Sequence, residues 1–374
     1  MKIEILKDNL KRGLEIVEKI AKKNLTLPVL SNVLLSCEGN FLRLDTTNLE
    51  TSISWWVLAK IEEGGKIAIP AAFFSSLINL LKEERIHLRS QGKNLILETK
   101  NQTTQIQGID PEEFPIIPKI EKEEIVRISN QKLLEALGQI IEIPSISQIR
   151  PEISGIYFSF KKDLLKIVGT DSFRLAEKTI GLKGKIKKEV SFILPQDAVR
   201  ELINILSREE GYVVIYFSPN QILFENIKEE TSHTQVQILS RLIEGEYPKY
   251  QEIIPKKYKT QIISKKDDLQ NQLKQAGLFS GKISEVKLAV QPEDNRLKIY
   301  SESPEIGKNE AYLPVKIKGE AIEISFNYKF LILGLQNIRS SEVIFELNGE
   351  EGPGVLKPVG DESYIYISMP IKLS

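Results

Sequence analysis

The hydrophobic pattern of the chain repeats three times, at an interval of about 125 residues. In each copy a short apolar run typical of a strand precedes a run with the periodicity of an amphipathic helix. The strand patterns lie at residues 67–70, 192–195 and 322–326, and the helix patterns that follow them extend to Leu81, Leu206 and Ile338. The pattern therefore predicts one domain repeated three times.

The earlier half of each third also shares an order, which is a helix followed by two strands. The predicted helix stripes are Leu10, Leu14, Val17 and Ala21, then Leu133, Leu137, Ile140 and Ile141, then Leu269, Leu273 and Ala276. Asp8 and Ser264 are the predicted caps of the first and third of these helices. The strand pairs are expected at 33–36 and 41–46, 155–160 and 164–169, and 286–291 and 296–300. Helices with one apolar face need a sheet to cover, so we expect an α+β fold with two helices packed on antiparallel β-sheets in each third.

The length of 374 residues exceeds what one hydrophobic core usually supports. Segments rich in proline and charge, at 110–118 and 244–255, resemble each other and suggest repeated linkers. We predict domains at residues 1–120, 121–246 and 247–374. A hydrophobic content of 41% with 27% charged residues is typical of globular chains and excludes a disordered one.

The residues that would build an active site are scarce. The sequence contains no glycine-rich phosphate loop, no His-Glu-x-x-His and no Gly-x-Ser-x-Gly. Its histidines are His87 and His233, and Cys37 is its one cysteine. We therefore predict no catalytic residue, no metal site and no cofactor. A hydrolase using Asp45, Asp110 and Asp171 remains an alternative, but no spacing joins these carboxylates into one site.

The sequence also bears on location and on partners. One cysteine cannot form an internal disulfide, the first residues alternate like a strand, and no apolar run reaches the roughly 18 residues of a membrane span. We expect a cytoplasmic protein with no membrane partner. The formal net charge is zero, so nucleic-acid binding would depend on a local basic surface. Lysine and arginine do collect on the predicted helices, although solvated helix faces explain such charges equally well.

Four short segments, in order along the chain, carry a resemblance. They are Thr-Leu-Pro-Val-Leu at 26–30, Thr-Asp-Ser-Phe-Arg-Leu-Ala at 170–176, Tyr-Pro-Lys-Tyr at 247–250 leading to Ile254 and Pro255, and Met-Pro-Ile-Lys-Leu at 369–373. With the threefold repeat, they make the chain resemble the bacterial sliding clamps, the β subunits of the DNA polymerase III holoenzyme. The resemblance implies a non-catalytic processivity factor, a head-to-tail homodimer that closes into a six-domain ring around duplex DNA without sequence specificity.

The resemblance also implies functional surfaces. Short peptides of the replicative polymerase, the clamp loader, repair polymerases and mismatch-repair factors would bind a pocket lined by Ile153, Thr170, Phe173, Arg174, Leu175, Pro248, Ile253, Ile367, Met369, Pro370, Ile371 and Leu373. The basic residues expected to face DNA are Lys11, Lys19, Lys22, Lys23, Lys82, Lys132, Arg200, Lys265, Lys266, Lys274 and Lys329. The dimer interface would involve Leu278 and Phe279 of the last domain and Thr104 and Ile106 of the first. The family places the protein in the cytoplasm, at the nucleoid.

The chain departs from the family pattern at a few of these positions. Ser172 stands where the family usually has glycine, Glu252 where a basic residue often lies, and Lys372 where the last arginine is usual. Asn24 occupies a loop position where some relatives carry arginine near DNA. The alternative function is a clamp-like scaffold that binds protein partners without encircling DNA.

Overall fold

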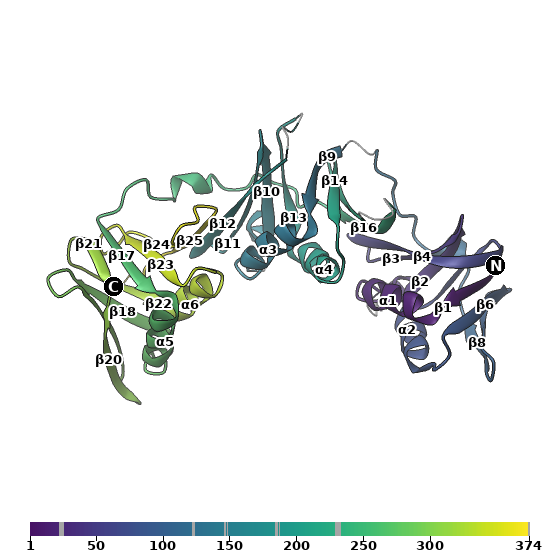
Figure 1. Ribbon diagram of the computed structural model, residues 1–374, viewed down its shortest axis with the longest axis horizontal. Coiled ribbons are helices and arrows are strands. Elements are labelled where there is room, and N and C mark those ends of the chain that lie inside the picture. Colours follow the sequence, from purple (N-terminus) through teal and green to yellow (C-terminus); the bar gives the residue numbers. More distant parts are fainter. Residues whose placement is uncertain are drawn as a thin grey trace. The chain divides into compact units, whose positions relative to one another are not determined.

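The computed structural model describes residues 1–21, 26–121, 124–145, 147, 149–183, 186, 188–228 and 233–372, and for residues 124 and 125 the backbone alone. Each third has the order strand, helix, four strands, helix, three strands, and the last third has one additional short strand (Figure 1). The predicted repeat and the α+β fold class are confirmed.

The elements of the first third are β1 (Lys2–Leu6), α1 (Lys7–Val17), η1 (Pro28–Ser31), β2 (Asn32–Glu38), β3 (Phe41–Thr47), β4 (Thr51–Glu63), β5 (Lys66–Pro70), α2 (Ala71–Leu80), β6 (Arg85–Gln91), β7 (Asn94–Glu98), β8 (Thr103–Gln107) and η2 (Pro111–Glu113). Those of the second are β9 (Glu124–Ser129), α3 (Asn130–Ile140), η3 (Pro151–Ile153), β10 (Gly155–Lys161), β11 (Leu164–Thr170), β12 (Arg174–Gly181), β13 (Val190–Pro195), α4 (Gln196–Leu206), β14 (Tyr212–Ser218), β15 (Gln221–Ile227), β16 (Thr234–Arg241) and η4 (Tyr250–Glu252). Those of the third are β17 (Thr260–Lys265), α5 (Lys266–Gly277), β18 (Glu285–Gln291), β19 (Arg296–Ser303), β20 (Gly307–Pro314), β21 (Lys316–Gly319), β22 (Ile322–Asn327), α6 (Tyr328–Gln336), β23 (Glu342–Leu347), β24 (Gly354–Pro358) and β25 (Tyr364–Ser368).

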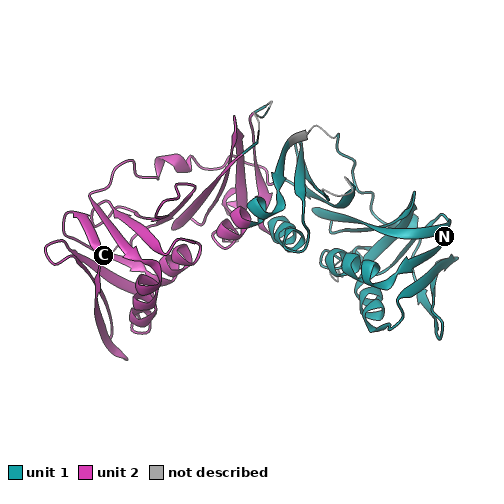
Figure 2. Ribbon diagram, in the orientation of Figure 1, with its two compact units in different colours: residues 1–134, 182–188, 197–242 teal, residues 135–181, 189–196, 243–374 magenta. Residues whose placement is uncertain are grey.

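The chain forms two compact units whose limits divide the second third (Figure 2). Unit 1 holds residues 1–134, 182–188 and 197–242, and unit 2 holds residues 135–181, 189–196 and 243–374. In each unit, the last strand of one third extends the sheet of the third before it. β16 pairs antiparallel with β4 in unit 1, and β25 pairs antiparallel with β12 in unit 2. Strand pairing thus links successive thirds through main-chain hydrogen bonds.

Two of the strands at sheet edges stand at repeat positions that are paired elsewhere in the chain. β8 ends the large sheet of unit 1 after β7, and β20 ends the four-stranded sheet of unit 2 after β19. β8 is the last strand of the first third, and β20 is the fourth strand of the last third. The strands at the repeat position of β8 are β16 and β25, and those at the position of β20 are β4 and β12. These strands pair between thirds, β16 with β4 and β25 with β12.

Helix packing on the sheets follows the predicted apolar stripes. Leu10 and Leu14 of α1 are fully buried, and the helix crosses Trp55 of β4. A Cβ atom on Gly13 would lie 2.6 Å from the Trp55 ring, so glycine is required for this close approach. In each unit the helices lie on the same side of the sheets (Figure 2).

The two predicted helix caps are wrong. The chain passes from β1 into α1 without a turn, so Leu6 is the cap residue and Asp8 lies in the first turn beside Lys7. α5 starts after Lys265 in the same way, and the Ser264 hydroxyl donates to the Lys265 carbonyl instead of capping the helix. No helix among the described residues is long and apolar enough to cross a membrane.

Candidate functional site

The turn between β11 and β12 presents Phe173 to solvent. The Asp171 carboxylate accepts hydrogen bonds from the backbone N–H groups of Phe173 (3.0 Å) and Arg174 (2.9 Å), and the Thr170 hydroxyl accepts one from Ser172 (3.2 Å). Ser172 has φ of 77°, the left-handed region that favours glycine. The turn therefore places Ser172 in a conformation that glycine adopts readily, and it holds Phe173 with 63% of its surface exposed.

Arg174 is held by three segments of unit 2. Its Nε donates to Asp171 at 2.8 Å, an Nη donates to the Glu142 carbonyl at 3.3 Å, and the guanidinium lies 4.6 Å from the centre of the Phe330 ring on α6. An arginine fixed by planar contacts loses little further entropy when it binds a ligand. Arg174 is thus a rigid wall of the site.

The tail after β25 is docked by its main chain. The Met369 N–H donates to the Phe173 carbonyl and the Ile371 N–H to the Ser325 carbonyl, both at 2.8 Å. Met369, Pro370 and Ile371 are half-buried, so apolar surface of this tail stays accessible beside Phe173. The predicted pocket residue Leu373 lies outside the described residues.

The linker that enters the third repeat forms the other side of the site. Tyr247 stacks on Tyr157 with ring centres 4.7 Å apart, and the Tyr250 hydroxyl donates to the buried Glu177 at 2.6 Å. Both tyrosines belong to a buried cluster completed by Val168, Leu175, Ile193, Val355 and Ile367. The cluster fixes the linker segment that carries Pro248, which is half-buried, and Ile253, which is 47% exposed.

The described pocket residues of the sequence prediction all lie in unit 2, but they divide into two layers. Leu175, Ile153 and Ile367 are at most 5% exposed and form a floor, whereas Phe173, Ile253 and the tail offer accessible surface. Sequence reasoning missed Tyr157, Glu177 and Phe330, which hold the accessible residues in place. The Tyr247-Pro-Lys-Tyr250 motif was the available signal for the linker anchor.

A turn stands at the position of the Phe173 turn in each of the other thirds, and the one in the first third has the same hydrogen bonds. In the first, Asn48 accepts from the N–H groups of Glu50 (3.0 Å) and Thr51 (2.7 Å), and Leu49 has φ of 75°. In the third, residues 303–307 make the corresponding turn, with Ile306 62% exposed. Glu50 and Ile306 thus stand where the second turn has Phe173.

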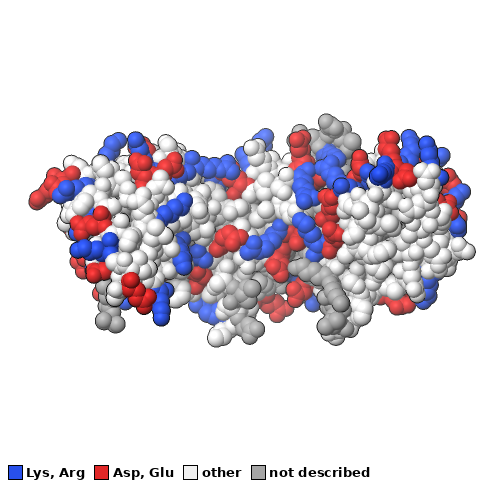
Figure 3. Space-filling model, turned by 90° about the horizontal axis from the view of Figure 1, so that it is seen from below, with Lys and Arg blue, Asp and Glu red and all other residues white. Residues whose placement is uncertain are grey.

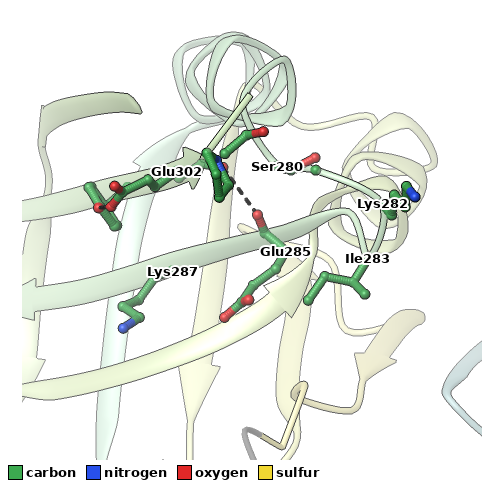
Figure 4. A pocket seen from close by; sticks show the side chains of 11 residues that line it. Ser280, Lys282, Ile283, Glu285, Lys287 and Glu302 are labelled. Carbon is green, nitrogen blue, oxygen red and sulfur yellow. Dashed lines mark hydrogen bonds between the residues drawn. The ribbon is translucent and has the colours of Figure 1, made fainter. Parts of the chain in front are cut away.

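A cavity of about 410 Å³ lies beside the third turn (Figure 4). Its walls are the loop 280–283, the start of β18 and the end of β19, with Lys282, Glu285, Lys287 and Glu302 among them. The corresponding place in the second repeat carries Tyr157 and Val168, which the linker tyrosines cover. In the third repeat the walls are charged instead.

The proposed DNA-facing residues lie on the helices or at their ends. Lys132, Arg200, Lys274 and Lys329 are exposed on α3, α4, α5 and α6. Lys11 on α1 is paired with Glu15 at 3.9 Å, and the Lys266 ammonium donates to the Ile338 carbonyl. Three further lysines flank helices: Lys19 follows α1, Lys82 follows α2 and Lys265 precedes α5. Lys22, Lys23 and Asn24 lie outside the described residues. Basic and acidic side chains are interspersed in Figure 3.

Uncharged surface accompanies the two free strand edges. α2 contains no charged residue, and Phe73 and Leu80 are 55% and 80% exposed on it. A broad area without charged side chains is visible on unit 1 in Figure 3. In unit 2, Leu278 at the end of α5 is 71% exposed and Phe279 is half-buried. Ile106 is only 3% exposed, so its side chain faces the core of unit 1, while Thr104 is half-buried on the same strand.

The carboxylates of the hydrolase alternative have other partners. Asp45 is buried, where it accepts from Arg43 at 2.9 Å and from Ser54 at 2.5 Å, and burial raises its pKa in spite of these contacts. Asp110 caps η2 through the Glu112 N–H, and Asp171 organises the Phe173 turn. Within the described residues, no three His, Cys, Asp or Glu side chains form a group that could hold a metal ion.

Comparison with known proteins covers nearly the whole chain. Residues 1–118, 127–249 and 251–372 match the N-terminal, central and C-terminal domains of the DNA polymerase III beta subunit. The chain is 27% identical to the beta sliding clamp of Bacillus subtilis over 384 residues and 26% identical to that of Synechococcus elongatus over 381, with all of each chain covered. The crystal structure of the DNA polymerase sliding clamp from Bacillus subtilis superposes with a TM-score of 0.93 at 26% identity, again over the whole of both chains.

Proposed function

The chain belongs to the DNA polymerase III beta subunit family and is a DNA sliding clamp, and from this we propose which of its surfaces bind peptides, a second copy and DNA. Encirclement of duplex DNA by a ring and processivity of the replicative polymerase follow from the family. The family also implies a processivity factor with no catalytic step of its own. We place it in the cytoplasm, at the nucleoid, where its DNA lies.

The peptide site is the surface formed by Phe173, Arg174, Ile253, Met369 and Pro370. Accessible apolar groups held by main-chain bonds and by a fixed arginine suit the capture of a short extended peptide. The floor of Ile153, Leu175 and Ile367 keeps the surface from collapsing when no peptide is bound. The peptides belong to the polymerase, the clamp loader, and repair and mismatch-repair factors.

The dimer closes by pairing β8 of one copy with β20 of the other, and the internal repeat gives the register. The Met369 N–H donates to the Phe173 carbonyl, and the Arg241 N–H donates to the Glu50 carbonyl, both at 2.8 Å. Gln107 of β8 stands at the repeat position of Arg241 and Met369. Ile306 of the third turn stands at the position of Glu50 and Phe173. We therefore expect the Gln107 N–H to donate to the Ile306 carbonyl of a second copy, in an antiparallel pair.

Comparison of corresponding positions in the repeats also predicts which residues of α2 contact the second copy. Phe330 and Asn337 of the third repeat contact Arg174 and Gln139 of the second, the latter through two hydrogen bonds. Phe73 and Leu80 occupy the positions of Phe330 and Asn337 in the first repeat, and both are exposed. We expect them to pack against the end of α5, at Leu278 and Phe279, in a second copy. Thr104 contributes to the interface through its backbone in β8. Ile106 packs in the core of unit 1 and supports β8 from that side.

The DNA surface consists of the basic side chains on the six helices. Lysines that reach phosphates without reading bases give weak, salt-dependent contact, which is compatible with sliding. The observation that carries the whole proposal is that β8 and β20 are sheet edges, whereas the strands at the same repeat positions pair with each other, as β16 with β4 and β25 with β12.

Topological retention tests the ring. Protein loaded on nicked circular DNA by a clamp loader should remain bound, and cutting the circle should release it. Equal retention on circular and linear DNA would instead favour the scaffold alternative, in which partners bind but DNA is not encircled.

A further inference from the structure

Another cavity, of about 380 Å³, lies in unit 1, where β4 changes its neighbouring strand. β4 pairs with β16 up to Trp55 and with β1 from Ala59 onward, so residues 56–58 stand between the two partner strands. The cavity opens at this gap, beside the exposed Asn9 and Arg12 of α1. Its other lining residues are Phe41, Trp55, Trp56, Val57, Leu58, Lys228, His233 and Gln235.

The walls combine aromatic rings with positive charge. Phe41 and His233 are stacked with ring centres 4.1 Å apart, and the Trp56 indole donates to Glu38 at 3.1 Å. Arg12 is anchored by the buried Glu209 at 2.5 Å and by the Arg208 carbonyl at 2.9 Å, so it stays at the rim. Lys228 supplies a second cation to the lining.

The corresponding place in unit 2 is occupied by the chain itself. Lys178 of β12 stands at the repeat position of Trp55, and its ammonium lies 2.8 Å from the Ser363 hydroxyl, 3.6 Å from Glu135 and 3.8 Å from Asp361. Glu135 and Asp361 are the repeat counterparts of Arg12 and His233. In the first repeat these three positions hold Trp55, Arg12 and His233, which line the cavity instead of a buried lysine and its acidic partners.

We propose that this cavity binds one nucleotide unit of single-stranded DNA, with the base against the aromatic walls and the phosphate between Arg12 and Lys228. Base stacking on aromatic side chains beside a basic groove is the usual chemistry of single-strand binding. The cavity opens beside α1, whose basic side chains are proposed above to face DNA, and the assignment to DNA rests on that function. A primer–template junction inside the ring would present such a single strand.

The chain supplies its own reporter for a test. Its two tryptophans are Trp55 and Trp56, and both line this cavity. Intrinsic fluorescence can therefore be titrated with an eight-residue oligo(dT) at low salt and, in parallel, with an abasic oligonucleotide of the same length. We expect saturable quenching by oligo(dT), and binding of the abasic strand at least about fivefold weaker because stacking is lost.

Lys228→Gln and Trp56→Phe should each weaken oligo(dT) binding about fivefold or more, with Lys161→Gln, an exposed residue of unit 2, as the matched control. Thermal unfolding checks that each variant is folded. No quenching, or equal affinity for abasic and dT strands, would overturn the proposal. So would quenching by an acidic aromatic peptide with none by oligo(dT), which would assign the cavity to a protein partner.

Retention on circular DNA is measured on the same variants. Oligo(dT) binding by protein that fails to stay on circles would refute encirclement and leave the cavity assignment intact. Normal retention without oligo(dT) binding would refute the cavity assignment alone.

Discussion

The Tyr250 hydroxyl donates a 2.6 Å hydrogen bond to Glu177, whose other oxygen lies 2.8 Å from the Lys166 ammonium. Glu177 is 5% exposed, so this contact satisfies a buried carboxylate and at the same time fixes the linker to the sheet. Burial, together with the hydrogen bond to Glu177, raises the pKa of the Tyr250 phenol well above its ordinary value, and the group remains a donor.

Tyr250→Phe should lower the free energy of unfolding by about 1 to 3 kcal/mol, because one oxygen of Glu177 is left buried without its donor. Urea unfolding measures the loss. Tyr258→Phe, at a tyrosine that is 38% exposed, is the control and should change stability little. Equal effects of the two substitutions would mean that the Glu177 contact contributes nothing beyond ordinary surface packing.

Met369→Ala combined with Pro370→Ala should abolish peptide binding, since it removes the accessible apolar part of the tail and keeps the Met369 N–H bonded to Phe173. Fluorescence anisotropy with a labelled clamp-binding peptide of the replicative polymerase gives the affinity. Dimer content and unfolding temperature should stay unchanged. An unaltered affinity would remove the assignment of the tail to the peptide site.

Gln107→Pro should weaken the dimer about tenfold or more. The Gly108 N–H bonds inward, to the Lys93 carbonyl, so the alternating Gln107 N–H faces the free edge of β8. Proline removes that donor and is tolerated on an edge strand. Gln107→Ala keeps the N–H and should dimerise normally. Sedimentation velocity over a range of protein concentration distinguishes the two variants, and equal dimerisation would refute the register.

Dimerisation and DNA contact should respond differently to salt. α2 and β8 carry no charged residue, so raising sodium chloride from about 50 to 500 mM should change the dimer dissociation constant little. Contact with duplex DNA should weaken steeply over the same range. Replacing Lys132, Lys274 and Lys329 by glutamine should flatten that slope, while Lys161→Gln should leave it unchanged. A slope that the triple substitution does not alter would mean that these lysines are only solvated.

Glu209 should give the folded chain a measurable pH dependence. Burial raises the pKa of this carboxyl, and the nearby Arg12 offsets the effect only in part. Between the ordinary value near 4.5 and the raised one, the folded chain binds more protons than the unfolded chain, so the free energy of unfolding falls as pH rises through that window. Glu209→Gln should therefore gain stability relative to the native chain from pH 4 to pH 7. Urea unfolding of both chains over this pH range measures the difference, and an equal pH dependence of the two would contradict the prediction.

Periodicity alone was sufficient for the repeat, since the stripes Leu10 to Ala21 and Leu269 to Ala276 mark buried faces of α1, α5 and the turn after α1. Periodicity did not predict where the helices begin. When a strand runs directly into a helix, the cap position need not carry a residue that a sequence rule recognises. Asp8 and Ser264 were assigned by residue type, whereas the backbone path decides the cap.

Predicting the site required more than local pattern. The family motifs predicted Phe173, Arg174 and the tail as site residues. They gave no signal for Glu177 or Phe330, because the contacts of these two residues depend on pairing between strands distant in sequence. Ile106 shows the same limit, since only the register of β8 on β7 tells which of its side chains face inward.

The free edges of β8 and β20 also mean that a single chain is an incompletely satisfied fold. In the proposed dimer, backbone groups that water solvates in the separate chain become hydrogen-bonded on association, and the exposed Phe73, Leu80 and Leu278 are covered in the same event. Association therefore acts on the folded state as a ligand would. We therefore expect the thermal stability of this protein to depend on its own concentration, so a melting temperature should be given with the concentration at which it was taken.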